Sequence, residues 1–206
     1  MIIGICGLIG SGKGTVGDML VEQDFKHESF ASSLKDATAK IFNWDRELVE
    51  GITDQSRIWR EAEDKWWGER LGIPNFTPRL ALQLIGTEVF RNHWHQDIWI
   101  LTMENRIKDA THNIVITDAR FPNEVQMIRR LGGKIVRVKR DEDPEWWNLA
   151  VTDPEQMPVL FPDVHSSEYS WAETTPDYLI TNNGTVSELQ NVVNDLLKDL
   201  LVPTQS

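Results

Sequence analysis

A glycine-rich loop directly follows an apolar run at the start of the chain, and it constrains the fold more than any other segment. The run is Ile2-Ile3-Gly4-Ile5-Cys6 and the loop is Gly7-Leu8-Ile9-Gly10-Ser11-Gly12-Lys13-Gly14-Thr15. Its spacing, G-x-x-x-x-G-K, is typical of a strand that ends in a phosphate-binding loop and a helix. A ligand-free glycine turn has no need of a lysine between two glycines. We therefore expect nucleotide phosphates to be bound by Gly10, Ser11, Gly12, Lys13, Gly14 and Thr15, with Lys13 at the β- and γ-phosphates.

The residue after Lys13 helps to distinguish between classes of phosphate-binding loop. The usual signature has Ser or Thr there, with its hydroxyl on magnesium, whereas this chain has Gly14 followed by Thr15. The spelling G-x-G-K-G-T resembles that of adenylate kinase and other nucleoside monophosphate kinases more than that of GTPases or motor ATPases.

Length and charge exclude several classes of protein. A chain of 206 residues suits one α/β domain with a small insertion. A formal net charge of −11 disfavours nucleic-acid and membrane surfaces as partners, because both are anionic. The single cysteine, Cys6, predicts neither disulfides nor a cysteine metal site, and no metal-ligand cluster is expected. Without a signal peptide or a membrane-spanning run, we expect a cytoplasmic protein.

Strand patterns alternate with helix patterns along the chain. Apolar runs predict strands at 2–6, 25–30, 113–118, 134–139 and 178–180. Helical stripes lie between them, with capping boxes expected at Ser33–Asp36 and Thr185–Glu188. This order predicts an α/β fold, a P-loop kinase core with a five-stranded parallel sheet between helices, in one domain over residues 1–206.

Two segments depart from this alternation. Residues 43–78 mix charges with tryptophans and are interpreted as an inserted helical segment on the substrate side. Residues 141–176 contain five prolines, Pro144, Pro154, Pro158, Pro162 and Pro176, and form the connection before the last strand. We expect this second segment to act as a lid-like loop.

A kinase also needs cations beyond Lys13 to hold donor and acceptor phosphates in line. Arginine suits this task because it stays charged and can hold phosphate oxygens in pairs. Arg120 is the leading candidate, since it follows the strand-end Asp118 by two residues, and Arg79 precedes a helix. The remaining candidates, each of which could equally lie on a solvated helix face, are Lys35, Arg57, Arg60, Arg91, Arg129 and Arg130.

Four further blocks, in order, resemble the deoxynucleoside monophosphate kinases of tailed bacteriophages. They are Leu34-Lys35-Asp36-Ala37; Leu82 to Thr87 with a downstream Trp99; Asp118 to Glu124; and His165-Ser166-Ser167-Glu168 followed by Ile180 to Gly184. The resemblance implies transfer of the γ-phosphate of ATP to a deoxynucleoside monophosphate, with Mg²⁺ as cofactor. It places the acceptor near Leu34, Lys35, Arg57, Arg79, Gln83, Gly86, Thr87, Asn92, Trp99, Asp118, Arg120 and Glu124.

The chemistry of these residues suggests a role for several of them. Lys35 and the arginines would clamp the acceptor phosphate, Asp118 would order magnesium water or the acceptor, and Glu124 would accept from a base edge. Lys13, Asp118 and Arg120 are the expected catalytic residues. Trp99 would stack on a base or sugar, unless it is a core residue.

Other residues are expected on the donor side. Arg129 or Arg130 would touch ATP phosphates, unless both are solvated. His165 and Glu168 would belong to the lid or the adenine site.

Three alternatives stay open at this point. A dephospho-coenzyme A kinase shares the loop and core. A nucleotide-switch GTPase should carry N-K-x-D and a Thr directly after the lysine, and this chain has neither. A nucleic-acid-dependent ATPase is disfavoured by charge and length. The expected partners are small-molecule nucleotides, and a homodimer is left open.

Overall fold

The structure, a computed structural model, describes residues 1–201. The chain forms two compact units, and each is described by itself. Unit 1 comprises Met1–Ser29 and the chain from Arg106 onward, and unit 2 comprises Phe30–Asn105. Within the described residues, no helix combines the length and the apolar character needed to cross a membrane.

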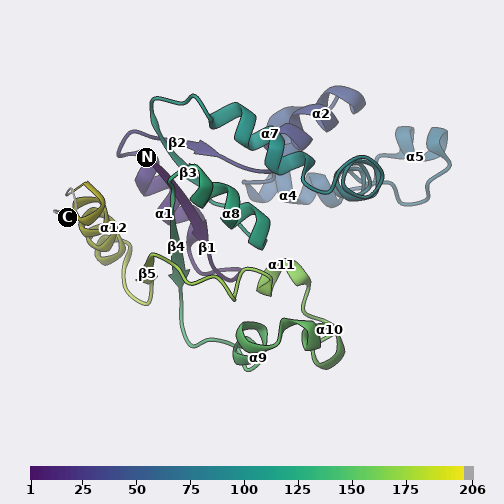
Figure 1. The fold of residues 1–206 in the computed structure, drawn as a ribbon. Helices are drawn as coiled ribbons and strands as arrows, with labels where there is room; N and C mark the ends of the chain where they lie inside the picture. The colour runs from purple at the N-terminus through teal and green to yellow at the C-terminus, as the bar shows by residue number, and fades with distance from the viewer. Residues whose placement is uncertain (202–206) are drawn as a thin grey trace. The chain divides into compact units, whose positions relative to one another are not determined.

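Unit 1 contains a five-stranded sheet in which every neighbouring pair is parallel (Figure 1). The strands are β1 (Ile2–Cys6), β2 (Phe25–Glu28), β3 (Asn113–Ile116), β4 (Lys134–Lys139) and β5 (Tyr178–Thr181), in the order β2-β3-β1-β4-β5. The expected parallel sheet is confirmed. The strands β2 and β3 are shorter than expected, because their pairing ends at Glu28 and Ile116. Beyond that point, the side chains of Ser29 and Asp118 are hydrogen-bonded to each other.

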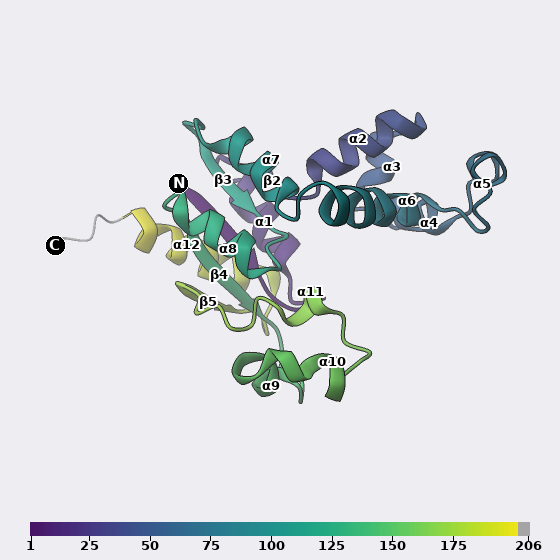
Figure 2. The same cartoon turned by 45° about the vertical axis from the view of Figure 1, so that its right-hand side comes forward.

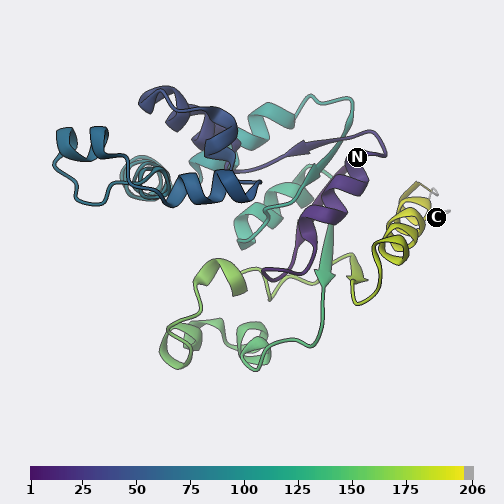
Figure 3. The same ribbon diagram turned by 180° about the vertical axis from the view of Figure 1, so that it is seen from behind.

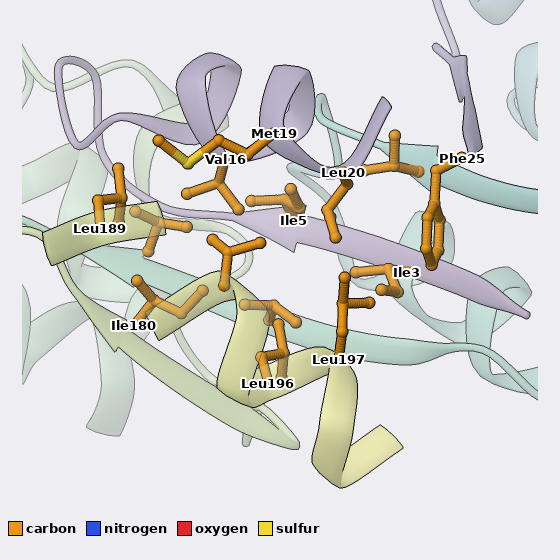
Figure 4. Close-up of a cluster of buried hydrophobic side chains, with 14 residues drawn as sticks. Ile3, Ile5, Val16, Met19, Leu20, Phe25, Ile180, Leu189, Leu196 and Leu197 are labelled. Carbon is orange, nitrogen blue, oxygen red and sulfur yellow. The ribbon is translucent and has the colours of Figure 1, made fainter. Parts of the chain in front are cut away.

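Helices cover both faces of this sheet. The helices α1 (Lys13–Val21) and α12 (Val186–Leu201) pack together on one face (Figure 3). There Ile3 and Ile5 of β1 join Val16, Leu20 and the apolar stripe of α12 in the main core (Figure 4). The intervening Gly4 points to the other face, where Ile128 of α8 (Pro122–Arg130) lies against it because alternate residues of a strand face opposite sides.

One of the two expected capping boxes is present. Thr185 accepts the N–H of Glu188 at 3.3 Å, and the Glu188 carboxylate accepts the N–H of Thr185 at 2.7 Å, just before α12. The box expected at Ser33 is wrong. The helix begins at Ser32 after Ala31, and no side chain caps it.

The connection between β4 and β5 contains short helices (Figure 2). They are α9 (Trp147–Thr152), the 3₁₀ helix η2 (Pro154–Gln156), α10 (Met157–Leu160) and α11 (Ser166–Tyr169). Its apolar side chains, including Trp147, Met157 and Trp171, are buried. The Arg137 guanidinium of β4 lies 3.9 Å from the Trp147 ring centroid and pairs with Asp143, which ties the connection to the sheet.

Unit 2 is helical. Its helices are α2 (Ser32–Phe42), α3 (Arg46–Glu50), α4 (Asp54–Glu61), α5 (Lys65–Leu71), α6 (Pro78–Gln83), the π-helix η1 (Leu84–Arg91) and the greater part of α7 (Ile98–Ile107). Side chains of Asp45, Thr53, Asp64 and Thr77 cap α3 to α6. The tryptophans that sit among charges in the sequence have a structural role here, since Trp44 and Trp59 pack on the cluster of Ala39, Val49 and Leu82.

Candidate active site

The phosphate loop leaves β1 and enters α1 at Gly12, which has a φ of 98°. This left-handed conformation favours glycine, and a Cβ at Gly12 would also overlap the Asn182 side chain. The Asn182 amide donates to the Ser11 carbonyl oxygen at 2.9 Å. Asn182, which follows β5, therefore holds the loop. In the sequence it belongs to the fourth block, but nothing there shows what it contacts.

Two features of the loop fit a phosphate. The Ser11 hydroxyl is buried and has no hydrogen-bond partner among the described residues, although buried hydroxyls are usually bonded. A Cβ at Gly10 or Gly14 would meet no atom within 4 Å, so that side of the loop is open. Backbone N–H groups at the start of α1 favour an anion there.

Lys13 is turned back onto its own loop. Its Nζ donates to the carbonyl oxygens of Gly7 and Leu8, each at 2.7 Å. Burial and the nearby charge of Arg120 lower the pKa of Lys13 from 10.5 to about 8, while Glu168 opposes this shift. The ammonium group is therefore held close to the loop with part of its hydration removed.

Arg120 and the lid-like connection meet close to the loop. The Arg120 Nη1 lies 3.6 Å from the Glu168 carboxylate and 3.4 Å from the Ser167 hydroxyl, both on α11. Glu168 also accepts the backbone N–H of Ile9, in the loop, at 3.3 Å. The structure thus brings together the expected catalytic residues Lys13 and Arg120, with Glu168 facing both.

Asp118 lies beyond the end of β3, and its carboxylate accepts from the Ser29 hydroxyl at 2.6 Å. Because β3 neighbours β1 in the sheet, their carboxyl ends share one edge, where ligands of such sheets bind. Asp118 is therefore in the expected position, and Ser29, which the sequence did not single out, fixes its side chain.

Two residues of unit 1 that were expected to contact ligands have protein partners in the structure. The buried Glu124 carboxylate accepts the backbone N–H groups of Arg120 and Phe121, at 2.8 and 3.2 Å, and so shapes the start of α8 rather than facing a base. Arg129 donates to the Thr175 carbonyl oxygen and lies near Asp177, which binds the first residues of β4. This is the amino edge of the sheet, away from the phosphate loop, and does not fit the expected ATP contact.

In unit 2, three cations surround Glu50 at the end of α3. Its carboxylate pairs with Lys35 and Arg46, and its carbonyl oxygen accepts from Lys35 at 3.3 Å and from Arg60 at 3.4 Å. Burial opposes ionisation of Glu50, but the hydrogen bonds from Lys35 and Arg46 lower its pKa. We call Lys35, Arg46, Glu50 and Arg60 the Glu50 cluster.

Arg60 is one of the candidate cations in the sequence, and the family resemblance does not place it near the acceptor. No ion pair joins it to a carboxylate within residues 1–201, and burial together with the charge of Arg79 lowers its pKa. By contrast Arg57, which was selected, is 65% exposed and pairs with Asp54 on its own helix. A half-buried arginine without a carboxylate partner is the better candidate for an anion. The expected role of Arg57 is therefore better matched by Arg60.

The remaining selected residues of unit 2 lie on α2, α6, η1 and α7. Arg79 on α6 pairs with Glu61 at 2.7 Å, Gln83 and Thr87 are exposed, and Asn92 donates to Glu88 at 3.0 Å.

Leu34 lies directly over Gly86, where a Cβ would overlap it. Trp99 is 7% exposed, and its indole N–H donates to the Gly86 carbonyl oxygen at 3.0 Å. This buried position favours the core alternative for Trp99.

Gly86 and Thr87 lie within the π-helix η1. Such wide helical turns are rare and often occur at functional sites, because they leave backbone groups free for other partners. Here the Gly86 carbonyl serves Trp99 instead of continuing a regular helix. The sequence pattern predicted an ordinary helix, so this feature was missed.

The parallel sheet, its strand order and the loop from β1 into α1 define the P-loop kinase class of enzyme. A family model described as deoxynucleotide monophosphate kinase matches residues 53–193. The chain belongs to the deoxynucleotide monophosphate kinase family, and the resemblance seen in the sequence blocks is confirmed.

Individual relatives agree with the family match. A protein of Acanthamoeba polyphaga mimivirus that carries the name of a deoxynucleotide monophosphate kinase is 27% identical over 94% of each chain. The deoxynucleoside-5'-monophosphate kinase of Escherichia phage T5 is 34% identical over 42% of this chain and 39% of its own.

Solved structures show weaker likenesses. TT1252 from Thermus thermophilus gives a TM-score of 0.46 at 19% identity, covering 98% of both chains. Shikimate kinase from Aquifex aeolicus gives 0.44 at 10% identity, covering 98% of this chain and 100% of its own. TM-scores below 0.5 say nothing about the activity of this chain.

Proposed function

We propose that this chain transfers the γ-phosphate of ATP to a deoxynucleoside monophosphate, giving the diphosphate and ADP. The observation that carries this proposal is that cationic side chains gather at two places in the chain. One is the phosphate loop with Lys13 and Arg120 in unit 1, and the other is the Glu50 cluster in unit 2. A kinase of this kind needs one for each phosphorylated substrate. Membership of the family supports the choice of acceptor.

On the donor side, residues 10–15 would hold the β- and γ-phosphates through backbone N–H groups. Lys13 would exchange its two carbonyl partners, Gly7 and Leu8, for phosphate oxygens. Arg120 would place its charge on the transferred group, where negative charge spreads over the oxygens. No covalent enzyme intermediate is needed, so these residues act by position and charge.

On the acceptor side, Lys35, Arg60 and Arg79 would hold the monophosphate. Lys35 and Arg60 already converge on one oxygen atom, which is the geometry that a phosphate oxygen needs. Gly86, Thr87 and the neighbouring Gln83 and Asn92 would line the nucleoside.

Mg²⁺ would neutralise phosphate charge when bound with ATP. Hard cations of this kind prefer carboxylate and hydroxyl oxygens and keep several waters. Asp118, which Ser29 orients, and Thr15, at the start of α1, offer such oxygens. Of the two, Asp118 would hold the metal or one of its waters, because Gly14 and not Thr15 stands directly after Lys13.

A coupled assay for ADP tests the proposal. The purified chain is supplied with ATP, Mg²⁺ and each of dAMP, dCMP, dGMP and dTMP in turn, and with dephospho-coenzyme A as the competing acceptor. We expect turnover with at least one deoxynucleoside monophosphate and none with dephospho-coenzyme A. The reverse result, or no turnover with the four nucleotides, would reject the proposal.

Two variants connect any turnover to the site. Lys13→Ala should abolish measurable transfer, and Arg120→Ala should lower kcat by about 100-fold, the loss typical of removing one charge-stabilising group. The matched control is Lys40→Ala, since Lys40 is exposed on α2 and should retain full activity. Circular dichroism and thermal unfolding should show all three variants folded.

A further inference from the structure

The Glu168 carboxylate contacts both the phosphate loop and Arg120. It accepts the Ile9 N–H at 3.3 Å, a bond that spans 159 positions of sequence, and it pairs with Arg120 at 3.6 Å. It also acts on Lys13, since its charge opposes the fall in the pKa of that residue. One carboxylate thus contacts a loop amide and an arginine, and its charge acts on the loop lysine; these are the same kinds of group that surround a phosphate.

We propose that Glu168 is an internal anion that occupies the phosphate site of the free enzyme, holds Arg120 there, and competes with the nucleotide phosphates. The inference rests on the proposed function, because it takes the loop to be the donor site. Glu168 is 18% exposed and sits on the four-residue helix α11, within the connection that follows β4. Displacing it frees the Ile9 amide and Arg120 together.

The alternative role, in which Glu168 contacts adenine, makes a different prediction about which ligands feel its charge. An anion that competes with phosphate weakens every polyphosphate, whether or not a base is attached. A carboxylate that accepts from a base edge strengthens ATP and leaves inorganic tripolyphosphate unaffected. Binding of these two ligands therefore separates the roles.

The test is calorimetric binding of tripolyphosphate, and of a non-hydrolysable ATP analogue, to Glu168→Gln. Glutamine has the same shape and can still accept the Ile9 N–H, but it carries no charge. We expect both ligands to bind about tenfold more tightly than to the wild-type chain, a gain equivalent to about 1.4 kcal/mol. The control is Glu173→Gln, which makes the same charge change at an exposed position of the same connection and should leave both affinities within a factor of about two.

Unchanged tripolyphosphate affinity in a folded Glu168→Gln would overturn the inference, as would weaker binding of the ATP analogue. If Glu168→Gln does not fold, Glu168→Asp gives the same information. The aspartate keeps the negative charge but has a shorter side chain. Tripolyphosphate and the ATP analogue should therefore bind more tightly than to the wild type, by less than with Glu168→Gln. Tripolyphosphate binding needs no acceptor, so a failure of the kinase proposal in the ADP assay is recognised separately.

Discussion

Lys35 and Arg60 donate to the same atom, the carbonyl oxygen of Glu50, from 3.3 and 3.4 Å. They reach it from α2 and α4, two helices that are separated in sequence by α3. Two cations on one backbone oxygen repel one another and are stable only with negative charge nearby, which the Glu50 carboxylate supplies. An acceptor phosphate would supply more.

Arg60→Ala should therefore weaken acceptor binding. We expect a rise in KM for the deoxynucleoside monophosphate of about 10- to 100-fold, the effect of losing one or two charge-assisted hydrogen bonds. The KM for ATP should not change, because the proposed donor site lies in unit 1. Steady-state kinetics with each substrate varied in turn measures both constants.

Arg57→Ala is the matched control for that substitution, since Arg57 lies one helical turn away on α4 and its partner is the exposed Asp54. Its acceptor KM should stay within about twofold of wild type, as exposed i,i+3 pairs contribute little. A larger effect at Arg57 than at Arg60 would restore the assignment made from sequence.

The pKa of Lys13 predicts opposite responses of nucleotide binding and protein stability to alkaline pH. Its pKa in the folded chain is about 8, against an ordinary value of 10.5. Above pH 8 the free enzyme loses the Lys13 charge, so the affinity for an ATP analogue should fall, by up to about tenfold per pH unit. Calorimetry between pH 7 and 9.5 measures this fall.

Over the same range the ligand-free chain should gain stability from this residue. The unfolded chain keeps the Lys13 proton up to about pH 10.5, whereas the folded chain releases it near pH 8, so the penalty of a buried charge disappears between those values. The free energy of unfolding, measured by denaturant titration, should therefore increase with pH for the wild type but not for Lys13→Met. Parallel pH profiles for the two proteins would show that Lys13 is not the titrating group.

Cys6 should not react in the native protein. Burial raises the pKa of its thiol to about 12, and it lies in β1 with its sulfur directed at the Val136 carbonyl. Because the thiolate is the reactive form, a thiol reagent at pH 8 should label the chain only as fast as it unfolds. The rate of labelling should rise with urea in step with the loss of helical circular dichroism, and rapid labelling without urea would contradict the burial.

Arg137→Lys should destabilise unit 1 even though it keeps the charge. The guanidinium lies over the Trp147 ring and pairs with Asp143 at the same time, which a lysine ammonium cannot reproduce. We expect a loss of about 1 to 2 kcal/mol in the free energy of unfolding. The neighbouring Arg140 is exposed, so Arg140→Lys should be neutral in the same urea titration.

The sheet and the phosphate loop could be predicted from sequence because their signals are local. The run before Gly7 is apolar, and the spacing to Lys13 fixes the turn. Arg57 and Arg60 could not be separated in this way, because both precede the same helix end and only the fold shows which one turns toward Glu50. The contacts of Glu124 could not be predicted for a related reason, since its carboxylate accepts from the two N–H groups just upstream.

Contacts between distant parts of the chain also could not be predicted from the sequence. The Asn182 bond to Ser11 spans 171 positions, and nothing in either segment indicates the other. In η1, the Gly86 carbonyl oxygen accepts from the Trp99 indole N–H, 13 positions further along the chain. Helical spacing of apolar residues is nearly the same in both kinds of helix and does not distinguish them.

The two ends of unit 2 are joined within unit 1. Arg106, where the chain returns, donates to the Ser29 carbonyl oxygen at 3.1 Å and to the Glu28 carboxylate at 2.8 Å, so the points of departure and return are fastened to each other. Unit 2 is thus one uninterrupted excursion between β2 and β3. All five strands of the sheet lie outside this excursion. The residues proposed to hold the acceptor phosphate therefore all lie on that single length of chain.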